Sequence, residues 1–153
     1  MEVRRLRFGE RETARRLFSM MNAVFEEPGE PVSDGYLDGL LGSAAFWAIA
    51  ALSGDHVVGG LTAHTLPMTR GESSELFIFD VAVHADYRRQ GIGRQLIDVL
   101  GASAAEAGIE TLFVPADKED EEALEFYRAI GGEPMAVTMF TFAALQPRST
   151  IAS

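Results

Sequence analysis

Apolar residues recur along this chain with two different periods, which together predict a mixture of helices and strands. Spacings of three to four residues, as at Ala14, Leu17, Met21 and Val24, are typical of one face of a helix. Short apolar runs bounded by turn residues are typical of buried strands. The predicted helices cover residues 10–25, 33–41 and 120–130 and a stretch through Leu96, Ile97 and Leu100. The predicted strands cover residues 2–8, 46–52, 57–66, 75–83, 110–115 and 134–145.

Turn and capping residues separate these elements. Ser33 suits the N-cap of the second helix, and Gly131 and Gly132 suit the end of the last one. The order is β-α-α-β-β-β-α-β-α-β, which we assign to one domain over residues 1–145. We expect residues 146–153 to form a flexible C-terminal tail.

The composition limits the class of protein. Of the 153 residues, 47% are hydrophobic, as in a globular domain, and charges or turn residues interrupt every apolar run before it reaches membrane-spanning length. The first residues lead directly into a strand, so we expect no signal peptide and a cytoplasmic location. There is no cysteine, which excludes disulfides, thiolate metal ligands and a cysteine nucleophile, and we expect no metal ion.

The chain is acidic, with a net charge of -10 from 23 acidic and 13 basic residues. This charge disfavours nucleic acid and anionic membranes as partners, because both are negatively charged themselves. It favours a cationic small-molecule substrate, although an acidic surface without any binding role would give the same balance.

The most informative motif stands between the strand at residues 75–83 and the helix through Leu96. It reads Arg88-Arg89-Gln90-Gly91-Ile92-Gly93. Glycine lets a ligand approach the backbone, while the first N–H groups of a helix, its dipole and the arginines favour an anion such as a pyrophosphate. A dinucleotide fingerprint would need glycine at Leu96, and a P-loop would need Gly-Lys-Ser/Thr, which the chain lacks. The alternative is an ordinary helix start whose glycines allow close packing.

Together with the strand before it and the helix after it, this motif fits the pattern Arg/Gln-x-x-Gly-x-Gly/Ala and resembles the GNAT acyl-CoA-dependent N-acetyltransferases. The resemblance covers nearly the whole chain. It implies an α+β (mixed α/β) fold, in which helices flank a mixed, mostly antiparallel sheet that splits between its fourth and fifth strands. It also implies acetyl-CoA as co-substrate and a homodimer. The residues that it assigns to the cofactor are Val81, Ala82, Val83, Arg88, Arg89, Gln90, Gly91, Ile92, Gly93 and Arg94.

Tyr127 is the predicted general acid. The segment around it resembles the Tyr-x-x-x-Gly segment of this family, in which a tyrosine can donate a proton to the departing sulfur. A purely structural role is the alternative, because Leu124, Tyr127 and Ile130 share one face of an amphipathic helix.

Carboxylates are the candidates for the base that deprotonates the attacking amine. Asp80 is an ionisable residue within an apolar strand, so it either faces the site or pairs with a buried cation. Asp117 follows the strand at residues 110–115, where a loop enters the site. Either could take the proton directly or through a water molecule. We expect Trp47 and most Met and Phe residues to lie in the core, and we expect structural roles for His56, His64 and His84.

Further segments resemble the aminoglycoside 3-N-acetyltransferases, the gentamicin-type resistance enzymes. These segments are residues 31–37, 58–61, 65–67 and 77–83 and the pair Ala116-Asp117 ten residues before Tyr127. The resemblance implies that ammonium groups of the drug bind to carboxylates, which here are Asp80, Asp117, Asp120 and Glu121. Helix capping and the helix dipole also account for the last two. Lys118 and Glu119 stand where relatives often have an aromatic residue and a glycine, which leaves the drug subtype open.

Two other functions fit the same residues. A similar acetyltransferase could act on a polyamine, a peptide N-terminus or a lysine, since these acceptors are cationic too. A non-catalytic acyl-CoA-binding module could use the same fold, although Asp80 and Tyr127 argue against it. The activity we expect is transfer of an acetyl group to the 3-amino group of an aminoglycoside.

Overall fold

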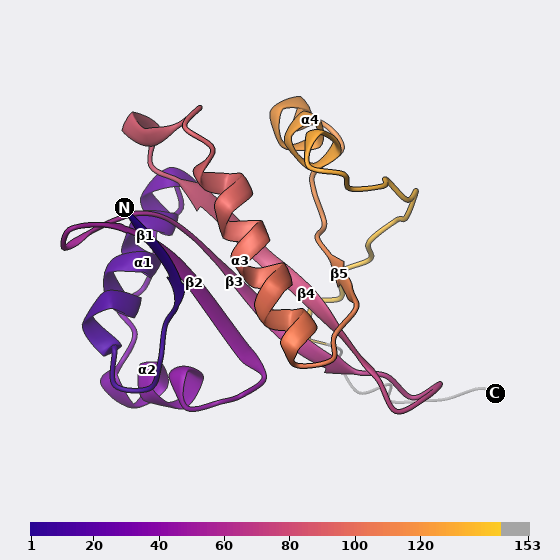
Figure 1. Ribbon diagram of the computed structural model, residues 1–153, viewed down its shortest axis with the longest axis horizontal. Helices are drawn as coiled ribbons and strands as arrows, with labels where there is room; N and C mark the ends of the chain where they lie inside the picture. Colours follow the sequence, from indigo (N-terminus) through magenta and orange to yellow (C-terminus); the bar gives the residue numbers. More distant parts are fainter. Residues whose placement is uncertain (145–153) are drawn as a thin grey trace. The chain divides into compact units, whose positions relative to one another are not determined.

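The structure, a computed structural model, describes residues 1–144, which divide into two compact units. The first unit, Met1–Ala116, contains one sheet, three α-helices and a short 3-10 helix, η1 (Ala85–Tyr87) (Figure 1). The second unit begins at Asp117 and contains helix α4 (Glu121–Ala129). Within residues 1–144, no helix is both long and apolar enough to cross a membrane.

The sheet of the first unit is mixed and mostly antiparallel, as predicted. Its strands are β1 (Glu2–Arg5), β2 (Phe46–Ser53), β3 (His56–Pro67), β4 (Ser74–Val83) and β5 (Thr111–Phe113), and they lie side by side in this order (Figure 1). The first four strands pair antiparallel, whereas β5 pairs with β4 in parallel. The two edge strands are shorter than the predicted residues 2–8 and 110–115, because only part of each segment has a neighbouring strand to bond with.

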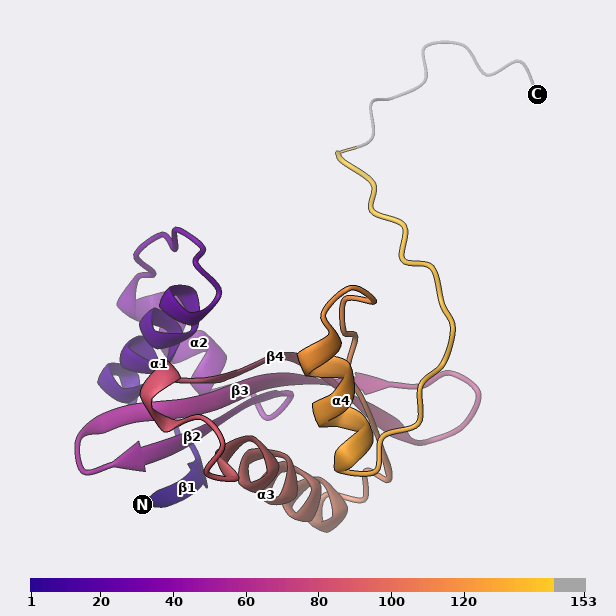
Figure 2. The same cartoon turned by 90° about the horizontal axis from the view of Figure 1, so that it is seen from above.

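Helices cover both faces of this sheet (Figure 2). Helices α1 (Arg11–Val24) and α2 (Asp34–Leu41) lie on one face, and α3 (Ile92–Glu106) lies on the other. The core on the α3 side includes Ile92, Leu96, Leu100, Ile49, Leu61 and Leu76. The core on the α1–α2 side includes Leu17, Met21, Leu37, Phe46, Leu52 and Ala82. The predicted N-cap is confirmed, since Ser33 Oγ accepts a hydrogen bond from the Tyr36 N–H at 3.1 Å.

Strand β4 has a paired half and an open half. Strand β5 pairs only with Glu75, Leu76 and Phe77, so among residues 1–116 no strand follows the outer edge of β4 from Ile78 onward. This arrangement is the predicted split between the fourth and fifth strands. It leaves the backbone groups on that edge of residues 78–83 open to a ligand.

A β-bulge at Phe79 changes which side chains of β4 face each helix layer. Thr62 of β3 lies opposite Asp80, whereas the next residue, Ala63, lies opposite Ile78. One extra residue in a strand reverses the alternation of its side chains. Ile78 therefore contributes to the core on the α3 side before the bulge, and Val81 does so after it. Asp80 consequently faces the α1–α2 side, as does Ala82 in that core.

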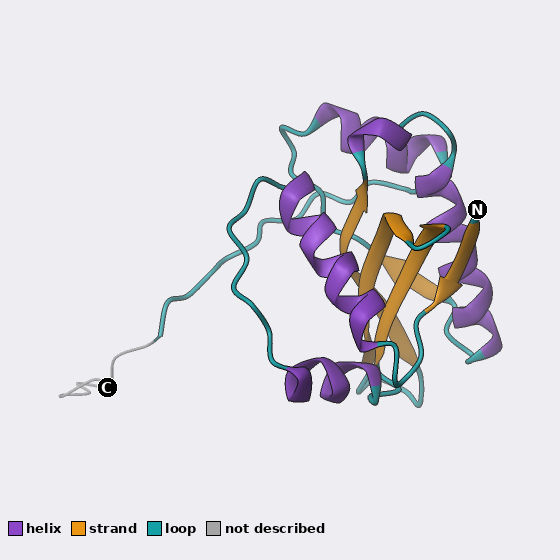
Figure 3. Cartoon of the chain, turned by 90° about the vertical axis from the view of Figure 1, so that its left-hand side faces the viewer, coloured by secondary structure: helices purple, strands orange, loops and turns teal. Residues whose placement is uncertain are grey.

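The predicted last strand is wrong for the residues that the structure describes. Residues 134–144 have no regular structure and are drawn as loop in Figure 3, and their large apolar side chains are 71–81% exposed. These side chains are Met135, Val137, Met139, Phe140 and Phe142. Residues 117–144 of the second unit offer them no strand with which to pair, and a strand cannot satisfy its backbone groups alone. Leu145 and the predicted tail lie outside the described residues.

Candidate active site

The turn between β4 and α3 forms a cradle of backbone N–H groups. Arg89 and Gly91 both have a positive φ, of 63° and 78°, which tightens the turn just before α3 begins at Ile92. Glycine adopts this conformation without steric cost. The Gln95 N–H makes the first bond of the helix, to the Gly91 carbonyl at 3.1 Å. The N–H groups of residues 92–94 therefore point out of the helix end, where the dipole attracts an anion.

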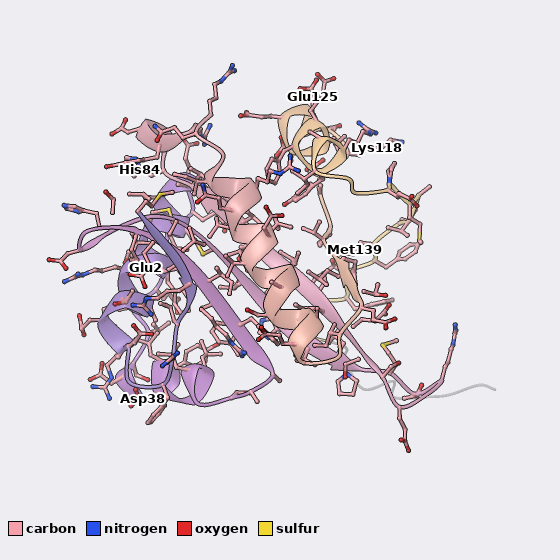
Figure 4. All side chains as sticks on the ribbon, viewed as in Figure 1. Glu2, Asp38, His84, Lys118, Glu125 and Met139 are labelled. Atoms are coloured by element: carbon pink, nitrogen blue, oxygen red, sulfur yellow. The ribbon has the colours of Figure 1, made fainter. Side chains whose placement is uncertain are left out.

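Close approach between the sheet and α3 holds this cradle in place. A Cβ added at Gly59 of β3 would lie only 2.9 Å from Cγ2 of Ile92, the first residue of α3. The chain beside the cradle is anchored at His84, whose N–H donates to the Val58 carbonyl at 2.8 Å. His84 Nδ1 in turn accepts from the Asp86 N–H at 3.1 Å, which gives this histidine a capping role (Figure 4).

The cradle combines these N–H groups with positive charge. Arg88, Arg89 and Arg94 are all exposed at or beside the helix end, where they can reach a bound phosphate. Val81 and Val83 turn their side chains to the core under α3, so only their backbone edge is available to a ligand. Ala82 is 4% exposed and belongs to the opposite core. This donor set suits the pyrophosphate of CoA, with an open strand edge beside it for the extended arm.

Asp80 lies in the open half of β4, directly before these valines. Burial raises the pKa of its carboxyl, and the charge of Glu27 raises it further. A cation at hydrogen-bond distance would lower this pKa instead. No cation is among the groups that shift this pKa, so nothing in residues 1–144 supports pairing of Asp80 with a buried cation. The role of Asp80 toward substrate stays a prediction.

The second unit contains the remaining predicted residues. Asp120 Oδ1 accepts from the Ala123 N–H at 3.1 Å, which confirms the predicted cap of α4, and Glu121 is exposed in its first turn. Asp117 is exposed, and its Oδ1 accepts from the Glu119 N–H at 2.8 Å. Tyr127 is partly buried, with its ring centroid 5.1 Å from that of Phe126. The roles of these residues toward substrate stay predictions.

The expectation that most Met and Phe residues lie in the core is wrong, although Trp47 is buried as expected. Of the six methionines only Met20 and Met21 are buried. Six of the ten phenylalanines are exposed, and they are Phe8, Phe25, Phe79, Phe113, Phe140 and Phe142. The prediction used only the hydrophobicity of these residues. The exposure of a side chain also depends on which parts of the sheet the helices cover. Phe79 directly precedes Asp80 in β4, and Phe113 lies in the edge strand β5.

Residues 13–131 match the model of the Acetyltransferase (GNAT) family, and the chain belongs to this family, whose members use acetyl-CoA. An aminoglycoside acetyltransferase from an uncultured soil metagenomic sample, solved in complex with trehalose, is 32% identical in sequence. Its TM-score is 0.87, with 95% of this chain and 96% of that chain covered. A complex of that enzyme with sisomicin gives 31% identity, equal coverage and a TM-score of 0.88.

Two further matches are more limited. AAC(6')-Iy was solved with a bisubstrate analogue that contains CoA and acetylneamine. It is 16% identical in sequence, with a TM-score of 0.79 and with 94% of this chain and 98% of that chain covered. This similarity shows the fold alone. The [ribosomal protein bS18]-alanine N-acetyltransferase of Escherichia coli (strain K12) is 33% identical over 57 residues, or 37% of this chain. The match spans only 38% of the length of that curated relative.

Proposed function

We propose that this chain transfers the acetyl group of acetyl-CoA to the 3-amino group of an aminoglycoside and thereby confers resistance to the antibiotic. One observation carries the proposal: the open half of β4 holds Asp80 directly before the edge that leads into the anion cradle. An acetyl donor bound along that edge would therefore lie beside an ammonium group bound at Asp80, on the same part of β4.

The chemistry requires a free amine, a polarised thioester and a stabilised leaving group. Asp80 or Asp117 takes the proton of the ammonium group, directly or through water, and the raised pKa of Asp80 makes it a better proton acceptor. The amine nitrogen then forms a bond to the carbonyl carbon, whose oxygen is held by a backbone N–H of β4. The C–S bond breaks, the electron pair goes to sulfur, and Tyr127 donates a proton to it. The nitrogen loses its second proton as the amide forms, and this proton restores the Tyr127 hydroxyl.

The choice of acceptor rests on charge and on the relatives. A net charge of -10 attracts a polycation, and the soil metagenomic enzyme of similar sequence over nearly its whole length was solved with sisomicin. The 3-amino position rests on the resemblance of residues 31–37 and 77–83 to the 3-N-acetyltransferases. A cytoplasmic homodimer is part of the same proposal, since relatives are commonly dimers.

Acetylation of a protein N-terminus is the second candidate. It is favoured by the 57-residue similarity to the alanine N-acetyltransferase, which covers little more than a third of this chain. An exposed carboxylate would bind an α-ammonium group as well as a sugar ammonium group, so charge alone does not separate the two acceptors.

Acetyl-CoA-dependent thiol release with a panel of acceptors tests the proposal. We expect turnover of gentamicin and sisomicin at kcat/KM values well above those for spermidine, a lysine peptide and a peptide that begins with alanine. Turnover of the alanine peptide alone would move the chain to the second candidate. Tight CoA binding without turnover of any acceptor would leave a non-catalytic binding module.

A further inference from the structure

An aromatic row crosses the sheet on the α1–α2 side. Phe46 of β2 lies directly opposite His64 of β3, His64 lies opposite Phe77 of β4, and Phe77 lies opposite Phe113 of β5. Residues directly opposite each other share one face of a sheet. Ring centroids are 5.4 Å apart for Phe46 and His64 and 5.1 Å apart for Phe77 and Phe113. The ring of Phe79, at the bulge, lies beside this row, with its centroid 6.4 Å from that of His64 and 5.8 Å from that of Phe77.

Helix α1 covers only one end of this row. Phe46 is 7% exposed, because Phe18 of α1 lies against it with a ring-centroid distance of 6.5 Å. Exposure rises toward β4 and β5, to 59% for Phe79 and 41% for Phe113. Within the first unit, the far end of the row is therefore an open apolar surface of the sheet, and such a surface is a common sign of a binding site.

Carboxylates stand beside the open rings. Asp80 follows Phe79 directly and faces the same side of the sheet, and Glu27, in the loop after α1, is close enough to influence its charge. That loop is held at its other end by Arg15, whose Nη1 donates to the Val32 carbonyl at 2.7 Å. Rings beside the Asp80 carboxylate suit a ligand with an apolar face and ammonium groups, and they disfavour a phosphorylated one.

We propose that His64, Phe77 and Phe79 form a platform on which an amino-sugar ring of the acceptor stacks, while Asp80 binds an ammonium group of that ring. The inference rests on the proposed function and adds the residues that select the acceptor. The planes of the Phe77 and Phe79 rings are 82° apart, so the C–H face of the sugar ring lies on one of them and contacts the edge of the other. The ammonium group at the edge of the sugar ring reaches Asp80. The anion cradle lies at the end of the same strand, so the platform does not compete for the cofactor site.

Substitution of Phe79 tests the platform, because its exposed side chain can be removed without opening the core. For Phe79→Ala we expect the KM for sisomicin to rise about fivefold to tenfold, while the KM for acetyl-CoA stays within about twofold. Phe79→Trp should keep the wild-type KM for sisomicin, since it keeps a stacking surface. Phe8→Ala is the matched control, because Phe8 is 67% exposed in the same unit and stands outside the row.

Two results would overturn the platform: a KM for sisomicin that is unchanged in Phe79→Ala, or a rise in both KM values together with a change from dimer to monomer in sedimentation. The second result would identify the surface as an interface between copies of the chain. Calorimetric binding of sisomicin separates this inference from the proposed function. If the wild-type protein binds sisomicin but does not acetylate it, and Phe79→Ala weakens this binding, the platform is supported and the proposed function is refuted. If the wild-type protein acetylates sisomicin and Phe79→Ala leaves the KM for sisomicin unchanged, the proposed function is supported and the platform is refuted.

Discussion

Gly59→Ala should move the first turn of α3 away from the sheet and weaken the cofactor site. The added Cβ would lie 2.9 Å from Ile92 Cγ2 and 3.3 Å from the Ala82 carbonyl oxygen. Ordinary carbon–carbon contacts are about 3.5–4.0 Å, so the helix end must shift by roughly 0.5–1 Å. Overpacking of this kind costs about 1–3 kcal/mol of folding free energy. The shift also misplaces the N–H groups of residues 92–94, which should raise the KM for acetyl-CoA about tenfold.

Urea unfolding and acetyl-CoA kinetics measure the two effects, and a second substitution tests their cause. Ile92→Ala removes the Cγ2 atom and by itself should cost about 2–5 kcal/mol, since Ile92 is 2% exposed. If the contact explains the loss, Gly59→Ala and Ile92→Ala together should cost at least about 1 kcal/mol less than the sum of the single changes.

Gly101→Ala in the middle of α3 is the matched control. A Cβ at this position meets no atom within 4 Å, so the same change should stabilise the helix by roughly 1 kcal/mol and leave the KM for acetyl-CoA unchanged. Strict additivity of Gly59→Ala and Ile92→Ala, or a KM for acetyl-CoA equal to that of wild type in Gly59→Ala, would refute the reasoning.

Three further predictions concern the carboxylates and the tyrosine. Tyr127→Phe should lower kcat about 100-fold with little change in CoA binding, and an unchanged rate across the pH range would exclude Tyr127 as the acid. Asp117→Asn should raise the KM for an aminoglycoside about tenfold but not that for acetyl-CoA, whereas two unchanged constants would remove Asp117 from the acceptor site. Burial and the charge of Glu27 raise the pKa of Asp80, so the folded state binds the Asp80 proton more tightly than the unfolded chain does. The free energy of unfolding therefore falls as the pH rises from the pKa of Asp80 in the unfolded chain to its higher pKa in the folded state. Asp80→Asn should therefore unfold at a higher urea concentration than wild type at pH 7, with the difference shrinking in acid; a lower midpoint at pH 7 would contradict this.

The local parts of the fold could be predicted from the sequence. The amphipathic spacing of Ala14, Leu17 and Met21 depends only on the helix period, and all three side chains are buried as α1 requires. The cofactor turn is equally local, since a strand, a glycine turn and a helix follow each other within about twenty residues. Gly91 accordingly has the positive φ that a tight turn before a helix needs.

Features that depend on distant segments could not be predicted. The bulge at Phe79 arises from the register between β3 and β4, which no local pattern reveals, and it decides which way Asp80 faces. Glu27 acts on Asp80 although 53 positions separate them in the sequence, because the fold brings the loop after α1 toward β4. The apolar alternation at Met135, Val137 and Met139 predicts a strand, but alternation does not supply the partner that a strand requires.

The most direct test of the central claim is the position of the acetyl group on the product. Sisomicin or gentamicin would be incubated with the protein and acetyl-CoA labelled with 13C at the carbonyl, and the amide nitrogen of the product would be assigned by two-dimensional NMR. We predict a single amide at the 3-amino group. A product acetylated at the 6'-amino group would refute the 3-N assignment, and the absence of any labelled amide, with acetyl-CoA still intact, would contradict the claim that aminoglycosides are the acceptors.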